Sequence, residues 1–513
     1  MSRLRLAGVA VLAAALLSPL APATAAPAPS GSSHLSLVRD TWRSFDAMTV
    51  RETGMPADNI GGDLDPATRS AYTSPTNIGS YLWSAIVAED LGLISRRELV
   101  SRTKTTLSSL ARLQRHLASG QYYNWYDPAT LERLTTWPVD GSVVYPFASS
   151  VDNAWLAAAL MVVRNAVPEA RKQAQDLLTP MDFSFYYDPV GRGPDVPAGL
   201  MRGGFWDTPP PDPQCSLPGN YTGVGPEVYY TCHTYGSFAS ETRMISYVAI
   251  SLGQVPPGHY FAPWRTFPDT CDWNWQEQKP SGEFVDYLGV PVFEGNYTYR
   301  GLTFVPTWGG DMFEELMPDM FVPEVRWGKD SWARQHSVYV RGQIEHGLND
   351  AEYGYWGFSP ASNPDGGYRE YGVDIMGLDG PGYTSDQEKT AVDVGFEGCR
   401  DAQPLPETYG DGVVTPHAVV LALPYQPRAA LTELAKLRRD FDAYGPGGYY
   451  DAIAVRSGKV AKRYLALDQG MIMGALGNLL GDDILRDAFT KGGAEQHLRP
   501  VMAMEEFNLP RRQ

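Results

Sequence analysis

The sequence predicts an all-α fold, an (α/α)6 barrel with long aromatic-rich loops and a few short β-hairpins. Three observations favour it. Apolar residues recur with a helical period through much of the chain, as in the stripe Val151, Ala154, Trp155, Ala158 and Val162. Long loops rich in Trp, Tyr, Gly and Asp separate the periodic segments. The strand–helix alternation typical of a parallel sheet is missing from the pattern.

The helical period predicts about eleven helices. Ser95 and Asp330 stand where helix N-caps are expected, and Pro168 and Pro427 suit first helical turns. The predicted helices are His34–Val50, Ile78–Leu93, Ser95–Ala118, Val151–Val163, Pro168–Met181, Ser237–Leu252, Asp330–Gly347, Pro416–Leu423, Pro427–Asp442, Asp468–Leu480 and Asp482–Thr490. This number is close to the twelve helices of six hairpins closed into a barrel. A helical solenoid is the alternative, although the sequence has no internal repeat of about 35–45 residues.

The loops between these helices are too long to be simple connectors, so we expect them to carry the function. Within them, Phe284–Phe293 and Tyr297–Val305 have the pattern of short β-hairpins. Motifs for nucleotide binding and for α/β-hydrolase chemistry are missing from the sequence. The functional loops are Gln121–Ser150, Phe183–Tyr235, Phe261–Val325 and Glu352–Val414.

The start of the chain has the pattern of a secretory signal peptide. Arg3 and Arg5 precede the apolar run Leu6–Leu20, and Ala23–Ala25 is an A-x-A cleavage site. We therefore expect residues 1–26 to be removed, residues 27–33 to form a flexible tail, and residues 34–513 to form a single catalytic domain. No later segment has about 18 uninterrupted apolar residues, so we expect a secreted, extracellular protein without a membrane span.

Charge and cysteine content narrow the class further. The formal net charge of −17 disfavours nucleic acid or an anionic membrane as a partner, because both bind basic surfaces. The mature chain keeps four cysteines, and an even number in an oxidising compartment suggests two disulfides. Of the three possible pairings we favour Cys215–Cys232, which closes a local loop, together with Cys271–Cys399, which joins distant loops. Metal binding is the weaker interpretation of these cysteines, since no C-x-x-C is present.

Six stretches of the sequence form an ordered set of motifs. They are Thr73–Gly79, Tyr123–Asp127, Ser149–Asn153, Ala239–Arg243 with Gly253–Pro256, Met312–Pro318, and Asp468–Met471. In this order they resemble the glucoamylase-like domain of cyclic β-1,2-glucan synthases, to which endo-β-1,2-glucanases are related.

The resemblance covers about residues 35–505 and implies an (α/α)6 barrel that cleaves or rearranges β-1,2-linked glucan with acidic residues in its mouth. The family usually has histidine where this chain has Asp468, and the cysteine-bearing loops are additions. The synthase's glycosyltransferase and phosphorylase-like regions do not occur in this sequence, so a complete synthase is not expected.

Two glutamates are the candidate catalytic pair, because glycoside cleavage commonly uses one carboxylic acid and one carboxylate. Glu241 lies at the predicted start of a helix, where it could instead stabilise the helix N-terminus. The resemblance selects Glu314 over its neighbour Glu315. Side chains of adjacent helical residues point about 100° apart, so we expect Glu315 to be a surface charge. Asp311 is a possible N-cap for this helix.

Further residues are candidates for sugar contacts, since aromatic rings and carboxylates commonly line sugar sites. Asp152 and Asp468 could equally be helix caps, and Tyr126 and Trp308 could be buried supports. Arg243 could orient Glu241 as an ion pair or lie on the helix surface. The candidate substrate-binding residues are Trp125, Tyr126, Asp127, Asp152, Tyr235, Arg243, Trp308 and Asp468.

These observations predict a secreted, endo-acting β-glucan hydrolase, most consistent with a β-1,2 linkage. Its partner is then a polysaccharide or oligosaccharide, and we expect neither a cofactor nor a metal ion. Two alternatives remain open at this point. One is a retaining transglycosylase acting on the same glucan, and the other is a secreted sugar-binding protein without catalysis. Side chains of Glu241 and Glu314 that point away from a common cleft would favour the binding protein.

Overall fold

The computed structural model describes residues 31–211, 214–268, 270–271, 275–378, 394–399 and 409–511. The predicted signal peptide lies outside these residues, as does most of the predicted tail. Fourteen α-helices form most of the regular structure in the described ranges. They are α1 Gly31–Met48, α2 Pro75–Asp90, α3 Arg96–Leu110, α4 Ser150–Ala166, α5 Arg171–Leu178, α6 Arg243–Ser251, α7 Met312–Leu316, α8 Glu324–Trp327, α9 Trp332–Glu345, α10 Pro416–Leu421, α11 Pro427–Asp440, α12 Ala466–Leu480, α13 Ile484–Thr490 and α14 Ala494–Met502.

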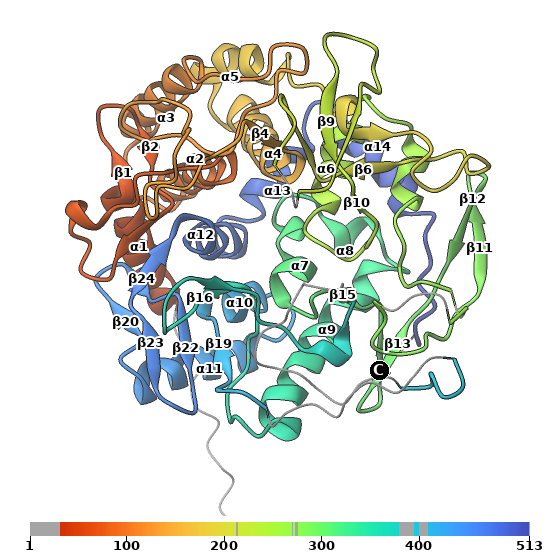
Figure 1. Cartoon of the computed structure of the whole chain (residues 1–513). Coiled ribbons are helices and arrows are strands. Elements are labelled where there is room, and N and C mark those ends of the chain that lie inside the picture. The colour runs from red at the N-terminus through yellow and green to blue at the C-terminus, as the bar shows by residue number, and fades with distance from the viewer. Residues whose placement is uncertain are drawn as a thin grey trace, which may run out of the picture.

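The helices form two layers (Figure 1). Helix α2 packs between α4 and α12, α4 also contacts α6, and α12 also contacts α10. Around them, α3 packs on α2, α5 on α4, α14 on α6 and α11 on α10. The short helix α7 contacts α9 and α10. The fold is therefore mainly helical, as predicted, and the closure of these helices into a barrel stays a prediction.

The core between the inner helices is aromatic and tightly packed. Trp83 of α2 and Trp155 of α4 are both buried. The ring centroid of Phe321 lies 5.2 Å from that of Trp83 and 5.8 Å from that of Trp155. Small residues let α12 approach α2 closely. A Cβ atom on Gly477 would lie only 2.4 Å from a methyl group of Val87. This contact requires glycine, because any larger side chain would push the helices apart.

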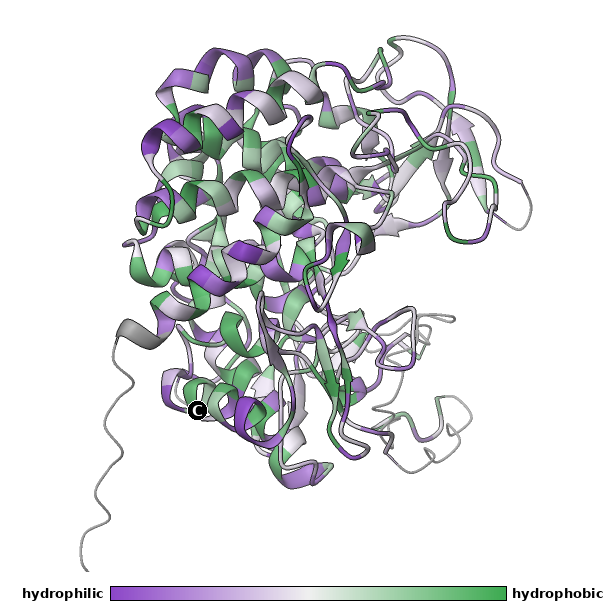
Figure 2. Cartoon of the chain, turned by 90° about the vertical axis from the view of Figure 1, so that its left-hand side faces the viewer, coloured by the Kyte–Doolittle hydropathy of each residue, from purple (hydrophilic) through white to green (hydrophobic). Residues whose placement is uncertain are grey.

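Strands and long loops gather on one side of the helical layers (Figure 2). Both predicted hairpins are present, as the pairs β11–β12 and β13–β14. The strands are β1 Thr49–Val50, β2 Met55–Pro56, β3 Asn59–Gly61, β4 Phe147–Ser149, β5 Tyr187–Asp188, β6 Leu200–Arg202, β7 Gly204–Trp206, β8 Ser216–Gly219, β9 Val228–Thr231, β10 Thr234–Tyr235, β11 Phe284–Tyr287, β12 Val290–Phe293, β13 Tyr297–Tyr299, β14 Leu302–Phe304, β15 Thr307–Trp308, β16 Ala361–Ser362, β17 Tyr368–Arg369, β18 Gly377–Leu378, β19 Val413–Val414, β20 Tyr444–Gly445, β21 Gly448–Tyr449, β22 Ala452–Ala454, β23 Lys459–Ala461 and β24 Arg463–Leu465.

Several helix boundaries differ from the predicted ones. Helix α3 ends at Leu110 rather than Ala118, because Arg115 pairs in extended conformation with Tyr122. Helix α6 begins at Arg243 rather than Ser237, since Ser237 and Phe238 pair with Trp264 and residues 238–243 form turns rather than helical hydrogen bonds. The sequence prediction also missed α8 and α14. The first has only four residues, and the second contains a proline.

Both predicted disulfides are present, Cys215–Cys232 and Cys271–Cys399. The first joins residues 17 apart and the second joins residues 128 apart. The second therefore links two of the long loops that were expected to carry function. Among the described residues, no helix has the length and apolar character needed to cross a membrane.

Candidate functional site

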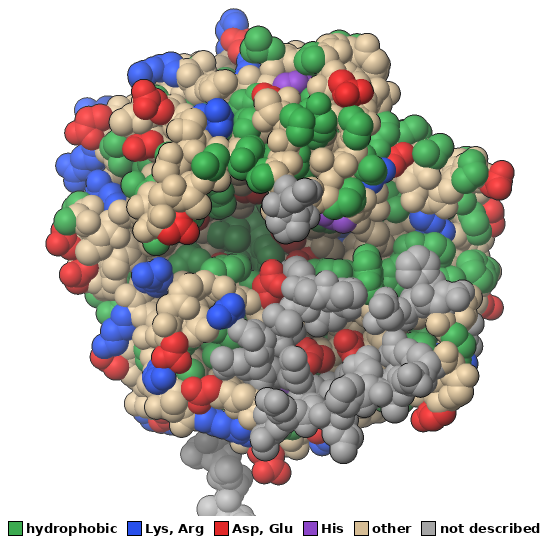
Figure 3. Space-filling view, viewed as in Figure 1, with side chains coloured by type: hydrophobic (Ala, Val, Ile, Leu, Met, Phe, Trp, Pro, Cys, Tyr) green, Lys and Arg blue, Asp and Glu red, His purple; other side chains and the backbone are tan. Residues whose placement is uncertain are grey.

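The loop-bearing face is hollowed near its centre, with acidic side chains at the edge of the hollow (Figure 3). In the same view, the hollow opens over α12, between α2 and α7 (Figure 1). The two candidate catalytic glutamates come from segments that meet in this central region. Glu241 precedes α6, and Glu314 lies in α7.

Glu241 occupies a turn two residues before α6 rather than the helix itself. Its carboxylate accepts a hydrogen bond from the indole nitrogen of Trp155, with Nε1 2.5 Å from Oε2. Trp155 is fully buried in α4, so it holds this carboxyl group from the core side. Glu241 as a whole residue stays partly exposed.

Glu314 lies directly beside Glu241. Its Oε2 atom accepts the backbone N–H of Glu241 at 2.5 Å, and its side chain also bonds to Ser240. Asp311 caps α7 by accepting the backbone N–H of Glu314 at 3.0 Å, as the sequence predicted. The structure therefore brings the two predicted catalytic residues together at one place.

Both carboxyl groups are hard to ionise. Burial is the main cause of the raised pKa of Glu241, and the charge of Glu314 raises that pKa further. Burial also raises the pKa of Glu314, to about 7, although bonds from Ser240 and from the Glu241 amide oppose the shift. Titratable groups with raised pKa values that face each other in a depression are typical of acid–base sites.

Glu315 is not the surface charge that the sequence analysis predicted. It is fully buried, and its carboxylate accepts hydrogen bonds from His336 at 2.6 Å and from Gln335 at 3.3 Å. The prediction was wrong because α7 is packed on both sides, against α9 and α10. Its two glutamates do point to different surroundings, but neither points to solvent.

Arg243 is likewise buried, and it pairs with Glu324 rather than with Glu241. Its Nε atom lies 2.7 Å from Oε1 of Glu324. Its terminal nitrogens donate to the backbone carbonyls of Ser240, Glu314 and Glu315 at 2.6–2.8 Å. Both predicted roles, surface residue and ion-pair partner of Glu241, are therefore wrong. Arg243 is a positioning residue that ties the Glu241 turn to α7.

Asp152 lies in the first turn of α4, but the helix is capped by Ser149. The carboxylate of Asp152 instead accepts hydrogen bonds from Thr76 at 2.7 Å and from Asn124 at 3.0 Å. Its charge contributes to the raised pKa of Glu241, so the two side chains are close. The cap interpretation was wrong because Ser149 already fills that position.

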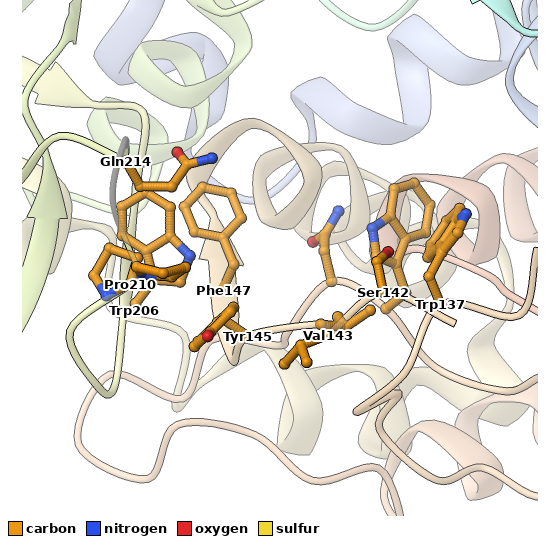
Figure 4. A pocket seen from close by; sticks show the side chains of 12 residues that line it. Trp137, Ser142, Val143, Tyr145, Phe147, Trp206, Pro210 and Gln214 are labelled. Carbon is orange, nitrogen blue, oxygen red and sulfur yellow. The ribbon is translucent and has the colours of Figure 1, made fainter. Parts of the chain in front are cut away.

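Asn124 connects this acidic region to an aromatic pocket of about 360 Å³. Figure 4 shows Phe147 and Trp206 on one side of the pocket and Trp137 on the other. Trp125 also lines it, as predicted for a sugar-contacting residue. All four aromatic side chains remain partly exposed, so their faces are available to a ligand.

The other predicted contact residues have mixed positions. Tyr126 is fully buried, and its hydroxyl bonds to the backbone of Gln114 and Tyr123, so it supports the loop. Asp127 accepts two backbone N–H groups in its own turn, from residues 129 and 130. Trp308 packs edge-on against Trp275 and stays partly exposed. Tyr235 is also partly exposed, and the charges of Glu241 and Asp152 contribute to its raised pKa, so it borders the acidic region.

Asp468 is buried in the first turn of α12, whose N-cap position is Leu465, so it is not the helix cap that was considered. It neighbours two residues that sequence reasoning missed, Asp451 and His417. Sequence reasoning also missed Asp58. The side chain of Asn77, which belongs to the motif Thr73–Gly79, donates a hydrogen bond to Asp58 at 2.8 Å. That motif was therefore the sequence signal that could have led to Asp58. No sequence motif marked Glu370, whose charge contributes to the raised pKa values of Glu314 and Asp311.

Comparison with known proteins places the chain in a family. The Glycoamylase family model, described as "Putative glucoamylase", matches residues 235–492, which is half of the chain. The chain belongs to this glucoamylase-like family. The matched region includes Glu241, Glu314 and Asp468. A second model, for the DUF3131 proteins of unknown function, matches residues 36–185.

One curated relative of this chain is named for β-1,2-glucan. The cyclic β-(1,2)-glucan synthase NdvB of Rhizobium meliloti is 22% identical over an alignment that covers 92% of this chain. That alignment covers only 18% of the synthase, so the chain spans less than a fifth of its relative.

Solved structures of endo-β-1,2-glucanases share the fold. The Chitinophaga pinensis enzyme has a TM-score of 0.61 at 16% identity, over 93% of this chain and 98% of that one. The Talaromyces funiculosus enzyme in complex with β-1,2-glucan has a TM-score of 0.60 at 12% identity, over 94% and 91% of the two chains. At these identities the likeness shows a common fold.

Proposed function

We propose that this chain is a glycoside hydrolase that cleaves β-1,2-linked glucan within the chain, using Glu241 and Glu314. One observation carries the proposal. The Glu314 carboxylate accepts the backbone N–H of Glu241, which holds two carboxyl groups with raised pKa values side by side. This juxtaposition supports an enzyme over a catalytically inactive binding protein, for which the two side chains would point apart.

The two glutamates differ in the ease with which they ionise, and this suggests their roles. Burial raises the pKa of Glu241 well above its usual value, which favours the protonated form that can donate a proton to the glycosidic oxygen. The pKa of Glu314 is raised to about 7, so this group is the one that can lose its proton near neutrality. Glu314 then activates water or attacks the anomeric carbon.

The substrate class is supported by the family and by the aromatic pocket. Relatives named for β-1,2-glucan cover nearly the whole of this chain. The pocket lined by Trp125, Trp137 and Trp206 offers flat faces for sugar rings, and Asn124 joins it to Asp152 near Glu241. A neutral glucan is also compatible with the strongly negative net charge.

Purified protein incubated with β-1,2-glucan tests the proposal directly. We expect new reducing ends and short oligosaccharides, with no comparable products from other α- or β-linked glucans. The rate should rise with pH through about 7, because Glu314 must lose its proton, and fall where Glu241 loses its own. Inactivity on a broad polysaccharide panel would contradict the proposal.

A transglycosylase is the second candidate, because the curated relative is a cyclic β-(1,2)-glucan synthase. The same incubation separates the two activities. A transglycosylase converts the glucan into longer or cyclic products without a net gain of reducing ends.

The aromatic pocket can be tested by Trp206→Ala. Loss of one aromatic contact, at roughly 0.5–1.5 kcal/mol, should raise KM by about 2- to 10-fold and leave kcat nearly unchanged. The matched control is Trp327→Phe at the buried α8, which lies outside the pocket. An unchanged KM in Trp206→Ala would remove the pocket from the substrate path.

We also propose that the protein acts outside the cell. The signal-peptide pattern of residues 1–26 supports this, and so do the two disulfides, which persist in oxidising compartments. Detection of the mature chain in the culture medium, starting near residue 27, would be the expected result.

A further inference from the structure

A second cluster of ionisable side chains is built from residues other than Glu241 and Glu314. His417 comes from α10, Asp468 from the first turn of α12, and Asp451 from the turn between β21 and β22. These side chains are only 1–2% exposed. Each offers a metal-ligating atom, and these three atoms all lie within 4.8 Å of one another.

Apart from the bond between the Asp451 and Asp468 carboxyl groups, most polar atoms of this cluster have no hydrogen-bond partner within the part of the chain that the structure describes. They are His417 Nδ1, Asp451 Oδ1, and both carboxylate oxygens of Asp468. Buried polar atoms without a partner are costly and uncommon in native proteins. Four such atoms at one place therefore point to something that binds them.

One tautomer of His417 leaves room for a cation. The Thr415 hydroxyl lies 3.3 Å from the Gly357 carbonyl and 3.5 Å from His417 Nε2, and when it donates to the carbonyl it accepts from Nε2. In that tautomer Nδ1 presents a lone pair toward Oδ2 of Asp468, 3.5 Å away. A cation between Nδ1 and Oδ2 would bind both acceptors.

We propose that His417, Asp451 and Asp468 form a binding site for a divalent transition-metal ion, with Zn²⁺ as the expected occupant. The 3.5 Å separation of Nδ1 and Oδ2 is close to the edge of about 3.4 Å that a tetrahedral site has when metal–ligand distances are ~2.1 Å. One imidazole and two carboxylates are common ligands of Zn²⁺. A dication would also neutralise the two carboxylates that bind it, and it would offset the repulsion between them and the neighbouring Asp58, whose charge raises the pKa of Asp468.

A second group with similar residue types shows what a satisfied cluster looks like. Asp319, Glu324 and His336 also lie close enough to hold an ion. Their atoms, however, are already occupied. Arg243 and His336 bond to Glu324, and Arg486 and Tyr425 bond to Asp319. Cations from the protein bond to that cluster. Among the described residues, no arginine or lysine bonds to the carboxyl groups of Asp451 or Asp468, although the charge of Arg463 lowers the pKa of Asp451.

The ion would have a structural role near the catalytic pair. The remaining oxygen of Asp451, Oδ2, accepts the backbone N–H of Ser362 in β16 at 2.7 Å. The β16–β17 hairpin continues to Glu370, whose charge raises the pKa of Glu314. A metal held by Asp451 would therefore fix both α10 and α12 and the hairpin beside Glu314.

Metal content measured by mass spectrometry tests the site on the full mature protein. After metal is stripped with a chelator and Zn²⁺ is added back, we expect one tightly held Zn²⁺ per chain and a higher thermal midpoint. Co²⁺ in its place should give the visible absorption of a four-coordinate site. Failure of the folded protein to retain Zn²⁺ or Co²⁺ would overturn the proposal.

Two variants locate the ion. Asp468→Asn should lose the bound Zn²⁺ and the metal-dependent rise in midpoint. Asp319→Asn, in the satisfied cluster, should keep both. Zn²⁺ retained equally by Asp468→Asn would place the ion elsewhere and contradict the assignment. A third outcome is that the wild type takes up no ion and Asp468→Asn is as stable as the metal-free wild type. That outcome would contradict the metal site and indicate that Asp451 and Asp468 share a proton instead.

Discussion

Glu314 and Glu315 are adjacent residues of one short helix, yet they lie in opposite electrostatic surroundings. Glu314 has acidic neighbours. Glu241 lies beside it, and the negative charge of Glu370 contributes, after burial, to its raised pKa. Glu315 instead bonds to His336 at 2.6 Å. Both glutamates are buried, so the difference lies in the charges around them rather than in exposure.

On the Glu315 side of α7, buried acidic and basic side chains form a network in which the charges are paired. His336 bridges Glu315 and Glu324, and Arg243 also pairs with Glu324. Burial disfavours the charge on His336, but its contacts with Glu315 and Glu324 outweigh burial and raise its pKa to about 9. Burial likewise opposes the charge on Glu324, but Arg243 holds its pKa down at about 2. Two cations and two anions balance there, which is typical of a structural site.

The Glu314 side has no comparable cation bonded to its carboxylates among the described residues. On this side the guanidinium of Arg243 bonds only to the backbone carbonyls of Ser240 and Glu314, and its charge lowers the two pKa values less than burial raises them. Both carboxyl groups therefore keep raised pKa values, that of Glu314 at about 7. One arginine thus holds the two glutamates in place without bonding to either carboxyl group.

The largest loss of stability is expected on the Glu315 side of α7, where the buried charges are paired. Glu315→Gln removes one anion and leaves the His336 and Arg243 cations under-compensated in the core, which should cost about 3–5 kcal/mol. Chemical denaturation of the purified variant measures the loss. Asp365→Asn, which breaks an exposed ion pair with Lys459, is the matched control and should change stability by less than about 1 kcal/mol. If Glu315→Gln is as stable as the wild type, Glu315 does not compensate the buried cations, and the proposed contrast between the two sides of α7 is wrong.

On the Glu314 side of α7, we expect a substitution to raise the free energy of unfolding rather than lower it. A carboxyl group whose pKa is raised on folding, here from 4.5 to about 7, loses stability as pH rises through that range. Glu314→Gln removes this cost, so at pH 8 the variant should be more stable than the wild type, by up to about 3 kcal/mol. At pH 4, where Glu314 is protonated, the two proteins should have similar stability. A destabilised Glu314→Gln protein at pH 8 would place Glu314 among the structural residues.

A second pH-dependent effect, on the Glu315 side of α7, sharpens the contrast. The stability that protonated His336 contributes is fully present below its unfolded pKa of 6.5 and is lost as pH rises through about 9. Wild-type unfolding free energy should therefore fall between pH 6.5 and pH 9. His336→Gln should lower stability at pH 6 and flatten this part of the curve. If the slope from pH 6.5 to 9 is the same in the variant, His336 is not charged in the folded protein.

The sequence predicted the scaffold better than the surroundings of single side chains. Apolar periodicity identified the long helices, because a buried stripe leaves a repeating pattern, and the even number of cysteines led to both disulfides. The resemblance supplied Glu241 and Glu314, which the structure brings together. Residues such as Arg243 and Glu315 were misplaced, because their burial depends on partners 71–81 and 20–21 positions away. His417 and Asp451 carried no local signal, since only the folded chain brings them to Asp468.

The central claim is that Glu241 and Glu314 act as one catalytic unit, and a double-mutant comparison on β-1,2-glucan tests it most directly. Glu241→Gln cannot donate a proton and Glu314→Gln cannot activate water or attack, so each should lower kcat by about 100- to 10,000-fold. The double variant should be little slower than the worse single variant, since a broken unit cannot be broken again. All three should still bind the glucan through the aromatic pocket. Full activity of Glu241→Gln, or losses that simply multiply in the double variant, would contradict the account.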